Sequence, residues 1–297
     1  MKLLFIVNPI SGGLDKDPFL KEAGKICFEY GVDYKFFKTT GKHDEIHLQK
    51  LLDAFQPDRV ASIGGDGTTL FSAKVLIDTH IPLGIIPFGS ANGLAMELSV
   101  NTNKKLALID IITSELIGNL DMILVNNKYH AIHIGDVGVN AQIVEGYDSD
   151  ENRGMITYAK YFIEQLQKSK PFSIEIEANN ETIQTEGVMV AICNGRKYGT
   201  GVPVNIHGNP MDGKFEIVII SKMEVKSILK AGLSKFDETF FDSENSHIIK
   251  TEDAEIRFNK KRLLQLDGEV IGEFKDLQVK ILPGAIKLIT TSKNVYV

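Results

Sequence analysis

The sequence RVASIGGDGTTLFSAKVLI, residues 59–77, decides the fold of the N-terminal part of the chain. Arg59–Ile63 has the character of a buried strand, and Thr68–Ile77 has the pattern of a helix. The turn between them, Gly64-Gly65-Asp66-Gly67-Thr68, combines glycines that let backbone N–H groups approach a phosphate with a helix N-terminus that favours an anion. The turn therefore predicts a phosphate site in which Asp66 faces magnesium or a ribose hydroxyl, with a tight turn capped by Asp66 as the alternative.

Strand and helix patterns alternate on both sides of this turn. Apolar or β-rich runs mark further strands, and helical spacing follows the first two of them, beginning at Asp17-Pro18 and at Asp44. Such alternation is typical of parallel βαβ units. The predicted strands of this region are Leu3–Val7, Tyr34–Phe37, Arg59–Ile63 and Leu83–Ile86.

Small polar loops follow all four predicted strands. Asn8–Gly13 (NPISGG) follows the first, Thr39-Thr40-Gly41 the second, and Pro87–Gly93 (PFGSANG) the fourth. Ser90 and Asn92 can both cap the next helix and touch a ligand. Because open α/β folds bind ligands at the carboxyl ends of their strands, we expect one nucleotide site along this edge. The chain has no Walker A pattern and no GxGxxG, which argues against the P-loop and ordinary Rossmann classes.

The pattern changes after about Asp121, where short strand-like runs and turns take over. Helical spacing persists at Met155–Gln167 and at Val225–Phe236. We therefore predict an α/β nucleotide-binding domain over residues 1–121, with a C-terminal return at about 284–297, and a mainly antiparallel β-sandwich over residues 122–283. The predicted strands are Lys128–Ile134, Phe172–Glu177, Val188–Cys193, Phe215–Ile220, Ala254–Phe258, Leu263–Leu266, Leu277–Leu282 and Ile286–Thr290.

Composition narrows the classes of function. The 33 basic and 39 acidic residues give a net charge of −6, which argues against a nucleic-acid partner. Two cysteines, Cys27 and Cys193, are too few for a disulfide framework and suit a cytosolic chain. No apolar run reaches the length of about 18 residues that suggests a membrane span.

The ordered set NPISGG, GGDGT, PFGSANGLA, MDG and LDGE resembles the diacylglycerol kinase catalytic-domain family, which includes soluble bacterial lipid kinases and sphingosine kinases. The resemblance covers roughly residues 3–290. It implies a cytoplasmic, peripherally membrane-associated enzyme that phosphorylates a lipid hydroxyl with ATP and Mg²⁺. The expected partner is a membrane lipid, met in a transient contact, and a homodimer is compatible with the chain.

The resemblance also assigns roles to residues. Glu269 is the implied general base, Asp66 approaches the phosphates or magnesium, and Asp121 helps to organise metal and water. Asp212 matches a structural magnesium site completed by carbonyls, here of Asn209 and Lys214. The expected nucleotide-binding residues, including the loop residue Asn92, are Asn8, Pro9, Ser11, Gly12, Thr39, Thr40, Gly64, Gly65, Asp66, Gly67, Thr68, Thr69, Leu70, Ser90 and Asn92.

Departures from the family pattern keep two rival functions open. Leu70-Phe71 stand where the family usually has Asn-Glu, and Asn92-Gly93 stand where the bacterial members have Asn-Asp. A kinase-like module that binds lipid or nucleotide without catalysis is one rival, and NAD kinase, which shares GGDGT, is the other. The basic turn Lys260-Lys261-Arg262 could touch an anionic membrane surface, although a solvated turn is the plainer interpretation.

Overall fold

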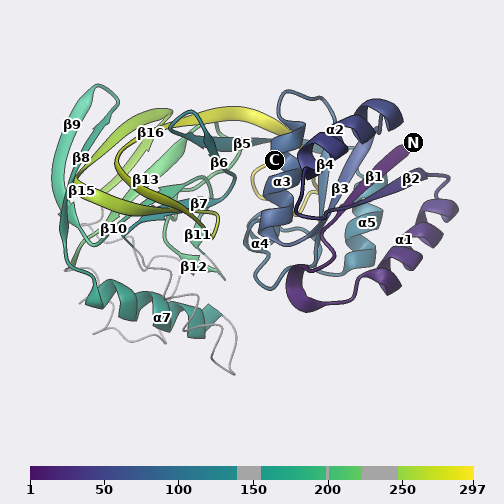
Figure 1. The fold of residues 1–297 in the computed structure, drawn as a ribbon, viewed down its shortest axis with the longest axis horizontal. Coiled ribbons are helices and arrows are strands. Elements are labelled where there is room, and N and C mark those ends of the chain that lie inside the picture. The colour runs from purple at the N-terminus through teal and green to yellow at the C-terminus, as the bar shows by residue number, and fades with distance from the viewer. Residues whose placement is uncertain (139–154, 199–200, 223–246) are drawn as a thin grey trace. The chain divides into compact units, whose positions relative to one another are not determined.

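The computed structural model describes residues 1–138, 155–198, 201–222 and 247–297. The chain divides into two compact units, which Figure 1 draws as ribbons. Unit 1 comprises Met1–Leu120 and Gly284–Val297, and unit 2 comprises Asp121–Pro283. The predicted helix at Val225–Phe236 lies outside the described residues.

Unit 1 is built on a parallel sheet in the order β16-β4-β3-β1-β2. The last strand of the chain begins in unit 2 and ends in unit 1, where Leu288 pairs with Leu83. The predicted C-terminal segment is therefore a strand of this sheet. The strands are β1 (Lys2–Val7), β2 (Asp33–Lys38), β3 (Arg59–Gly64), β4 (Leu83–Pro87) and β16 (Glu269–Ile289).

Helices cover both faces of this sheet (Figure 1). Leu3 and Phe5 of β1 point to one face, where they share a core cluster with residues of α1 and α5. Because side chains alternate along a strand, Leu4 and Ile6 point to the other face, where α2 and α3 lie in contact with each other. The helices are α1 (Asp17–Glu29), α2 (Asp44–Phe55), α3 (Asp66–Leu76), α4 (Gly93–Glu97) and α5 (Lys104–Thr113), with the 3₁₀ turn η1 (Ser11–Gly13).

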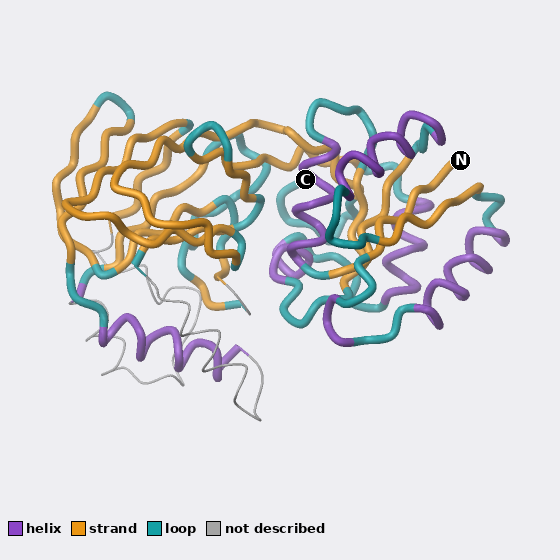
Figure 2. Tube along the Cα trace, in the orientation of Figure 1, coloured by secondary structure: helices purple, strands orange, loops and turns teal. Residues whose placement is uncertain are grey.

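The described residues of unit 2 form mainly antiparallel strands and include less helix than unit 1 (Figure 2). The pairs along the order β14-β13-β10-β7-β15-β16 are antiparallel, as are β15-β8, β8-β9 and β5-β6. The predicted fold class, an α/β domain followed by an antiparallel sandwich, is confirmed. The elements are β5 (Ile117–Val125), β6 (Tyr129–Ala131), β7 (Ile134–Val137), α7 (Met155–Lys168), β8 (Phe172–Ala178), β9 (Glu181–Gly187), β10 (Met189–Cys193), β11 (Lys197–Tyr198), β12 (Val202–Pro203), β13 (Phe215–Ile220), β14 (His247–Thr251) and β15 (Asp253–Leu266).

The continuous apolar run of β10 is explained by burial on both faces. Val190 and Ile192 point into one core cluster, whereas Met189 and Ala191 point into a second cluster, to which α7 contributes Phe162. A strand with one solvent-facing side would alternate apolar and polar residues instead.

Among the elements that the sequence prediction missed or divided, three have a clear physical reason. β9 carries mostly polar, exposed side chains because β8 is its one partner among the described strands. α5 is marked in the sequence by Asn103, whose side chain accepts hydrogen bonds from the amides of Lys105 (3.0 Å) and Leu106 (3.3 Å). Two predicted strands, Ala254–Phe258 and Leu263–Leu266, are halves of β15, joined through a shift in register.

Candidate active site

Three loops meet at the carboxyl edge of the unit 1 sheet because glycines let their backbones touch. A Cβ atom on Gly89, in the loop after β4, would lie 2.4 Å from the Cα of Gly65, in the turn after β3. A Cβ on Gly12, in the loop after β1, would lie 2.2 Å from the carbonyl oxygen of Phe88. Gly12 also has a positive φ of 65°, which favours glycine. Any larger residue at these positions would separate the loops.

Asp66 links two of these loops through hydrogen bonds. Its half-buried carboxylate accepts the backbone N–H groups of Gly93 (2.9 Å) and Leu94 (3.1 Å) at the start of α4. The residue is therefore a cap, but of the next helix rather than of α3, which it begins. A carboxylate has about four acceptor sites, so these two bonds leave acceptor capacity at Asp66 for a further ligand. Its role toward phosphate or magnesium stays a prediction.

Asn92 and Ser90 behave differently within the PFGSANG loop. The Asn92 side chain accepts the Gly89 N–H (2.7 Å) and donates to the Gly89 carbonyl (2.8 Å), while its own φ is 52°. The Asn92 side chain therefore stabilises the conformation of this loop through hydrogen bonds to the Gly89 backbone. Ser90 is exposed, so its hydroxyl is accessible to a ligand.

The loop after β1 is held by a lysine that the sequence prediction missed. Lys16, only 3% exposed, donates to the carbonyls of Ser11 (2.6 Å) and Leu14 (3.3 Å). Its ammonium group lies 5.5 Å from the centre of the Phe88 ring, and that of Lys104 lies 4.1 Å from the same centre. Burial, and then repulsion by Lys104, lower the pKa of Lys16. Lys16 therefore ties the first loop to the aromatic ring of the third.

Hydrogen bonds within the loop after β1 also fix the position of Asn8. Its side chain accepts the Ile10 N–H (3.2 Å), and its carbonyl accepts the Ser11 hydroxyl (3.2 Å).

In the loop after β2, Asp44 accepts the backbone N–H and the hydroxyl of Thr40. Burial acts to raise the pKa of Asp44, but the hydrogen bonds from Thr40 and Gly41 prevail and hold it below its usual value. The Thr39 hydroxyl donates to the Val7 carbonyl at 3.4 Å. Pro9 at the tip of the first loop is exposed.

The start of α3 offers one polar group that fits a phosphate. Thr69 and Leu70 are buried, and the Thr69 hydroxyl donates to the Gly65 carbonyl at 3.3 Å. The buried Thr68 hydroxyl, in contrast, has no hydrogen-bond partner among the described residues. Buried hydroxyls are rarely left unpaired. This orphaned group and the exposed Gly67 beside it fit a nucleotide phosphate.

A magnesium ion is compatible with this edge only as a companion of phosphate. The described parts of the chain contain no group of three or more His, Cys, Asp or Glu side chains that could hold a metal. Magnesium is usually bound by one or two carboxylates together with substrate phosphates and waters, and Asp66 can supply one carboxylate.

In unit 2, the predicted DGE motif forms a two-residue hairpin between β15 and β16. Asp267 and Gly268 have φ values of 47° and 88°, as in the turn type that Asp-Gly favours. The Asp267 carboxylate accepts three consecutive backbone N–H groups, those of Ile132 (2.8 Å), His133 (3.0 Å) and Ile134 (3.0 Å). These bonds anchor the turn, and Glu269 directly after it is exposed.

Asp121 is 1% exposed and supports the Asn209–Gly213 loop. Its carboxylate accepts the Gly213 N–H at 2.7 Å, and its own N–H donates to the Pro210 carbonyl at 2.8 Å. The Asp121 carbonyl accepts the side-chain amide of the fully buried Asn194 at 3.0 Å. Asp121 thus has a structural role within unit 2, and its predicted role in organising metal and water is untested.

In the Asn209–Lys214 loop, where a metal site was predicted, the ammonium group of Lys250 lies beside Asp212. The Asp212 carboxylate lies 2.6 Å from the ammonium group of Lys250, which also lies 3.1 Å from the buried Glu216. Burial raises the pKa of Glu216 although hydrogen bonds from Asn205 and Lys250 lower it. Asp212 also accepts the Lys214 N–H, and the Asn209 side chain accepts the Met211 N–H. Lys250 already supplies a positive charge at the Asp212 carboxylate, and metal binding by Asp212, Asn209 and Lys214 stays a prediction.

Two family models match the chain. The model described as "Diacylglycerol kinase catalytic domain" matches residues 2–125, and the "YegS C-terminal NAD kinase beta sandwich-like domain" matches residues 134–290.

Similar proteins include one from Staphylococcus carnosus (strain TM300), named "Putative lipid kinase", which is 26% identical over 78% of this chain and 76% of its own. A second "Putative lipid kinase", from Staphylococcus aureus (strain Newman), is 25% identical over 77% of this chain and 76% of its own. A crystal structure of a diacylglycerol kinase from Bacillus anthracis str. Sterne superposes with a TM-score of 0.79 at 22% identity, over 99% of this chain and 98% of that one. The last likeness concerns the fold alone.

Proposed function

The chain belongs to the family that joins a diacylglycerol kinase catalytic domain to a YegS C-terminal NAD kinase beta sandwich-like domain, and on this premise we propose that it is a lipid kinase. The proposed reaction moves the γ-phosphoryl group of ATP to the hydroxyl oxygen of a diacylglycerol-like or sphingoid-base-like lipid, and ADP leaves. The staphylococcal relatives named as lipid kinases support the class of acceptor.

One observation carries the nucleotide half of the proposal. The loops after β1, β3 and β4 meet at one sheet edge through Gly12, Gly65 and Gly89. Glycine-rich backbone at the carboxyl ends of parallel strands is where α/β folds bind phosphates. The orphaned Thr68 hydroxyl at the start of α3 adds a donor for a phosphate oxygen.

The chain's own residues organise the nucleotide edge for this reaction. Lys16, Asn92 and Asp66 hold the loops in register, so that their backbone is already organised when the nucleotide arrives. Such preorganisation lowers the barrier because phosphoryl transfer depends mainly on positioning and electrostatics. Asp66 would hold the magnesium ion that accompanies ATP at this edge, and that ion would supply positive charge to offset the phosphates.

Glu269 is the proposed general base. It directly follows a turn that Asp267 anchors through three backbone amides, so its backbone position is well defined. Its exposed carboxylate would take the proton from the lipid hydroxyl as the oxygen–phosphorus bond forms. A loose transition state demands little activation of the nucleophile, so an ordinary carboxylate suffices.

The lipid acceptor would be met at a membrane surface, in a transient peripheral contact. Among the described residues, no helix is both long and apolar enough to cross a bilayer. We do not propose a nucleic-acid partner, since the chain carries a net charge of −6.

The decisive experiment incubates the purified chain with γ-labelled ATP, magnesium and a panel of acceptors, and follows label transfer. Label should appear in a diacylglycerol or a sphingoid base dispersed in mixed micelles. NAD belongs in the same panel because unit 2 matches an NAD kinase-like sandwich model. Labelled NAD without labelled lipid would establish the rival kinase, and nucleotide binding without any label transfer would favour the non-catalytic module.

A further inference from the structure

A basic pocket of about 480 Å³ lies in unit 2, outside the residues assigned above. It is formed by the end of α7 and the segment that leads into β8, together with β15, β16 and Gly138 at the end of β7. Four basic side chains line it, namely Lys168, Lys170, Lys261 and Arg262, and Glu273 is the one acidic side chain of its lining. The lining therefore has an excess of three positive charges, whereas the whole chain has a net charge of −6.

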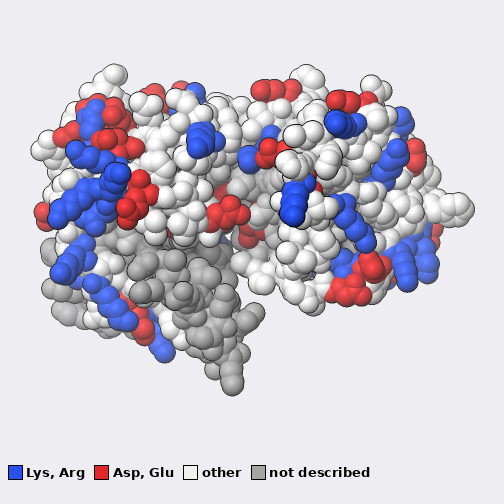
Figure 3. Space-filling model, viewed as in Figure 1, with Lys and Arg blue, Asp and Glu red and all other residues white. Residues whose placement is uncertain are grey.

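Basic side chains also gather on this part of unit 2 in the space-filling view. Figure 3 shows lysines and arginines along the left edge, over β8, β9, β15 and the adjoining end of α7. Acidic side chains accompany those near the upper strands. A concentration of one charge sign in a concave site raises the local concentration of ions of the opposite sign.

Arg262 gives the pocket its specific chemistry. Its guanidinium carbon lies 4.3 Å from the centre of the Phe172 ring, an arrangement that limits how the side chain can turn. Its buried Nε has no hydrogen-bond partner among the described residues. Because this Nε is buried, a ligand in the pocket would instead meet the terminal Nη groups of Arg262, which lines the pocket.

Arg257 on the same strand provides the contrast. It forms ion pairs with Glu175, Glu177 and Glu255, so this part of the fold can satisfy an arginine internally where structure alone requires one. The hydrogen bonds that Arg257 donates to Glu177, and then to Glu175 and Glu255, raise the pKa of Arg257. Among the described residues, no carboxylate forms an ion pair of this kind with Arg262. Arg262 therefore differs from Arg257 by presenting unused donors beside a cavity.

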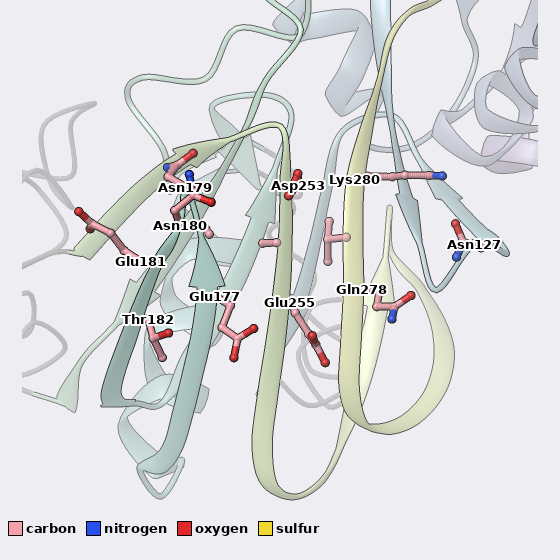
Figure 4. A pocket seen from close by; sticks show the side chains of 13 residues that line it. Asn127, Glu177, Asn179, Asn180, Glu181, Thr182, Asp253, Glu255, Gln278 and Lys280 are labelled. Carbon is pink, nitrogen blue, oxygen red and sulfur yellow. The ribbon is translucent and has the colours of Figure 1, made fainter.

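A second pocket in unit 2 has the opposite chemistry. It measures about 740 Å³ and lies between the β8-β9 turn and the strands β15 and β16 (Figure 4). Glu177, Glu181, Asp253 and Glu255 line it, against one basic residue, Lys280. This acidic lining repels an anion, so the two pockets of unit 2 differ in the sign of their charge.

We propose that the pocket lined by Lys168, Lys170, Lys261 and Arg262 binds a phosphate group, carried either by a soluble phosphate ester or by a phospholipid headgroup. A guanidinium group binds phosphate oxygens through two parallel N–H bonds, and the lysines act as surrounding point charges. The site is formed by residues of unit 2 and shares none with the loops of the unit 1 sheet edge. The proposal therefore does not depend on phosphoryl transfer.

A binding experiment without turnover tests this site and separates the two sources of phosphate. In one arm, calorimetry measures the affinity for glycerol 3-phosphate. In the other arm, sedimentation measures binding to phosphatidylcholine vesicles with and without phosphatidic acid. The variants are Arg262→Gln and Lys261→Gln, and Lys260→Gln is the matched control. Lys260 and Lys261 are adjacent, exposed and equally charged, but only Lys261 lines the pocket.

Arg262→Gln should weaken phosphate-dependent binding roughly tenfold or more, since a charge-assisted hydrogen bond is lost. Lys261→Gln should weaken it by about threefold, and Lys260→Gln by less than twofold, since an exposed point charge contributes little. The arm that shows these differences identifies the source of the phosphate. Equal losses of affinity in Lys260→Gln and Lys261→Gln would show that general electrostatic attraction, and not the pocket, binds the phosphate, and would overturn the proposal. The proposal would also be overturned if the wild-type protein bound neither probe. Lys261→Gln keeps the test valid if Arg262→Gln does not fold.

Discussion

Gly65 and Gly89 touch backbone to backbone: a Cβ atom on Gly89 would lie 2.4 Å from the Cα of Gly65, and one on Gly65 would lie 3.1 Å from the Cα of Gly89. The two glycines belong to different loops, after β3 and after β4. Their contact makes these loops one surface, and the hydrogen bonds from Gly93 and Leu94 to Asp66 lock the same two segments together.

Gly89→Ala should therefore damage nucleotide binding more than a glycine replacement elsewhere in the loops. The new methyl group would strike the Gly65 backbone and the Asn92 side chain, and forced overpacking of this kind costs about 1–3 kcal/mol. We expect weaker ATP binding by calorimetry and a lower melting temperature. Gly13→Ala is the control, because its φ of 62° makes it strained but its Cβ would meet no atom within 4 Å. Equal ATP affinity in both variants would contradict the loop contact.

Replacements of Asp66 should separate its structural role from its chemical role. Asp66→Ala removes the acceptor for two amides at the start of α4 and should lower stability by about 1 kcal/mol, as the loss of a helix cap does. Asp66→Asn keeps only one of the two accepting oxygens, because each carboxylate oxygen accepts a different amide, so its stability should fall between that of Asp66→Ala and that of the wild type. Both variants should lose phosphoryl transfer if the carboxylate charge serves the metal–phosphate complex. Full activity in Asp66→Asn would show that capping is its whole role.

Glu269→Gln should lower kcat by about 10²- to 10⁴-fold while ATP affinity and melting temperature stay near wild type. The physical reason is that glutamine keeps the size of the exposed side chain but cannot accept the proton. The neighbouring Asp267→Asn is the informative comparison. It weakens an anchor of three backbone amides, so it should lower the melting temperature as well as activity. An active Glu269→Gln enzyme at saturating ATP and lipid would assign the base elsewhere.

Lys250→Met should make the Asp212 loop sensitive to pH and to divalent ions. Without the ammonium group, the buried Glu216 and Asp212 face each other uncompensated, and we expect a loss of about 1–2 kcal/mol near pH 7, since Lys250 is partly exposed. Burial raises the pKa of Glu216, so the folded state favours its protonated form. That contribution is present at low pH and is lost as the pH rises through the folded-state pKa, so the destabilisation should shrink toward acidic pH.

Magnesium or calcium should raise the melting temperature of Lys250→Met and leave that of the wild type unchanged. Lys280→Met, on a neighbouring exposed position of β16, serves as the control for loss of one surface charge. Equal metal dependence in wild type and Lys250→Met would instead support a divalent site at Asp212 that coexists with the lysine.

Lys16→Met should raise the KM for ATP more than it lowers kcat. The variant loses two hydrogen bonds to the carbonyls of Ser11 and Leu14, so the first loop would be free to leave the Phe88 ring. Steady-state kinetics with varied ATP measures the split. Lys104→Met, which keeps those hydrogen bonds and removes the repulsion that lowers the pKa of Lys16, should leave the KM near wild type. A similar rise in KM in both variants would mean that general positive charge, not the tethered loop, holds the nucleotide.

The sequence by itself determined the fold class and the outline of the nucleotide edge. Strand and helix periods are local properties of the chain, and the order of the strands along the chain brings Asn8, Thr39, Asp66 and Ser90 to one edge once parallel pairing is accepted. The glycines of GGDGT and PFGSANG also predicted a close approach of the backbone, because glycine has no side chain to prevent it.

Only the tertiary structure decided which partner each polar side chain has. Asp66 reaches Gly93, 27 positions away, Asp267 reaches Ile132 across 135 positions, and Lys250 meets Asp212 across 38. No local period encodes such pairings, because they depend on how distant strands and loops come together. The surroundings of Arg262 were also decided by the tertiary structure. The sequence Lys260-Lys261-Arg262 suggests a solvated turn, but in the fold Arg262 packs against Phe172 and lines a pocket.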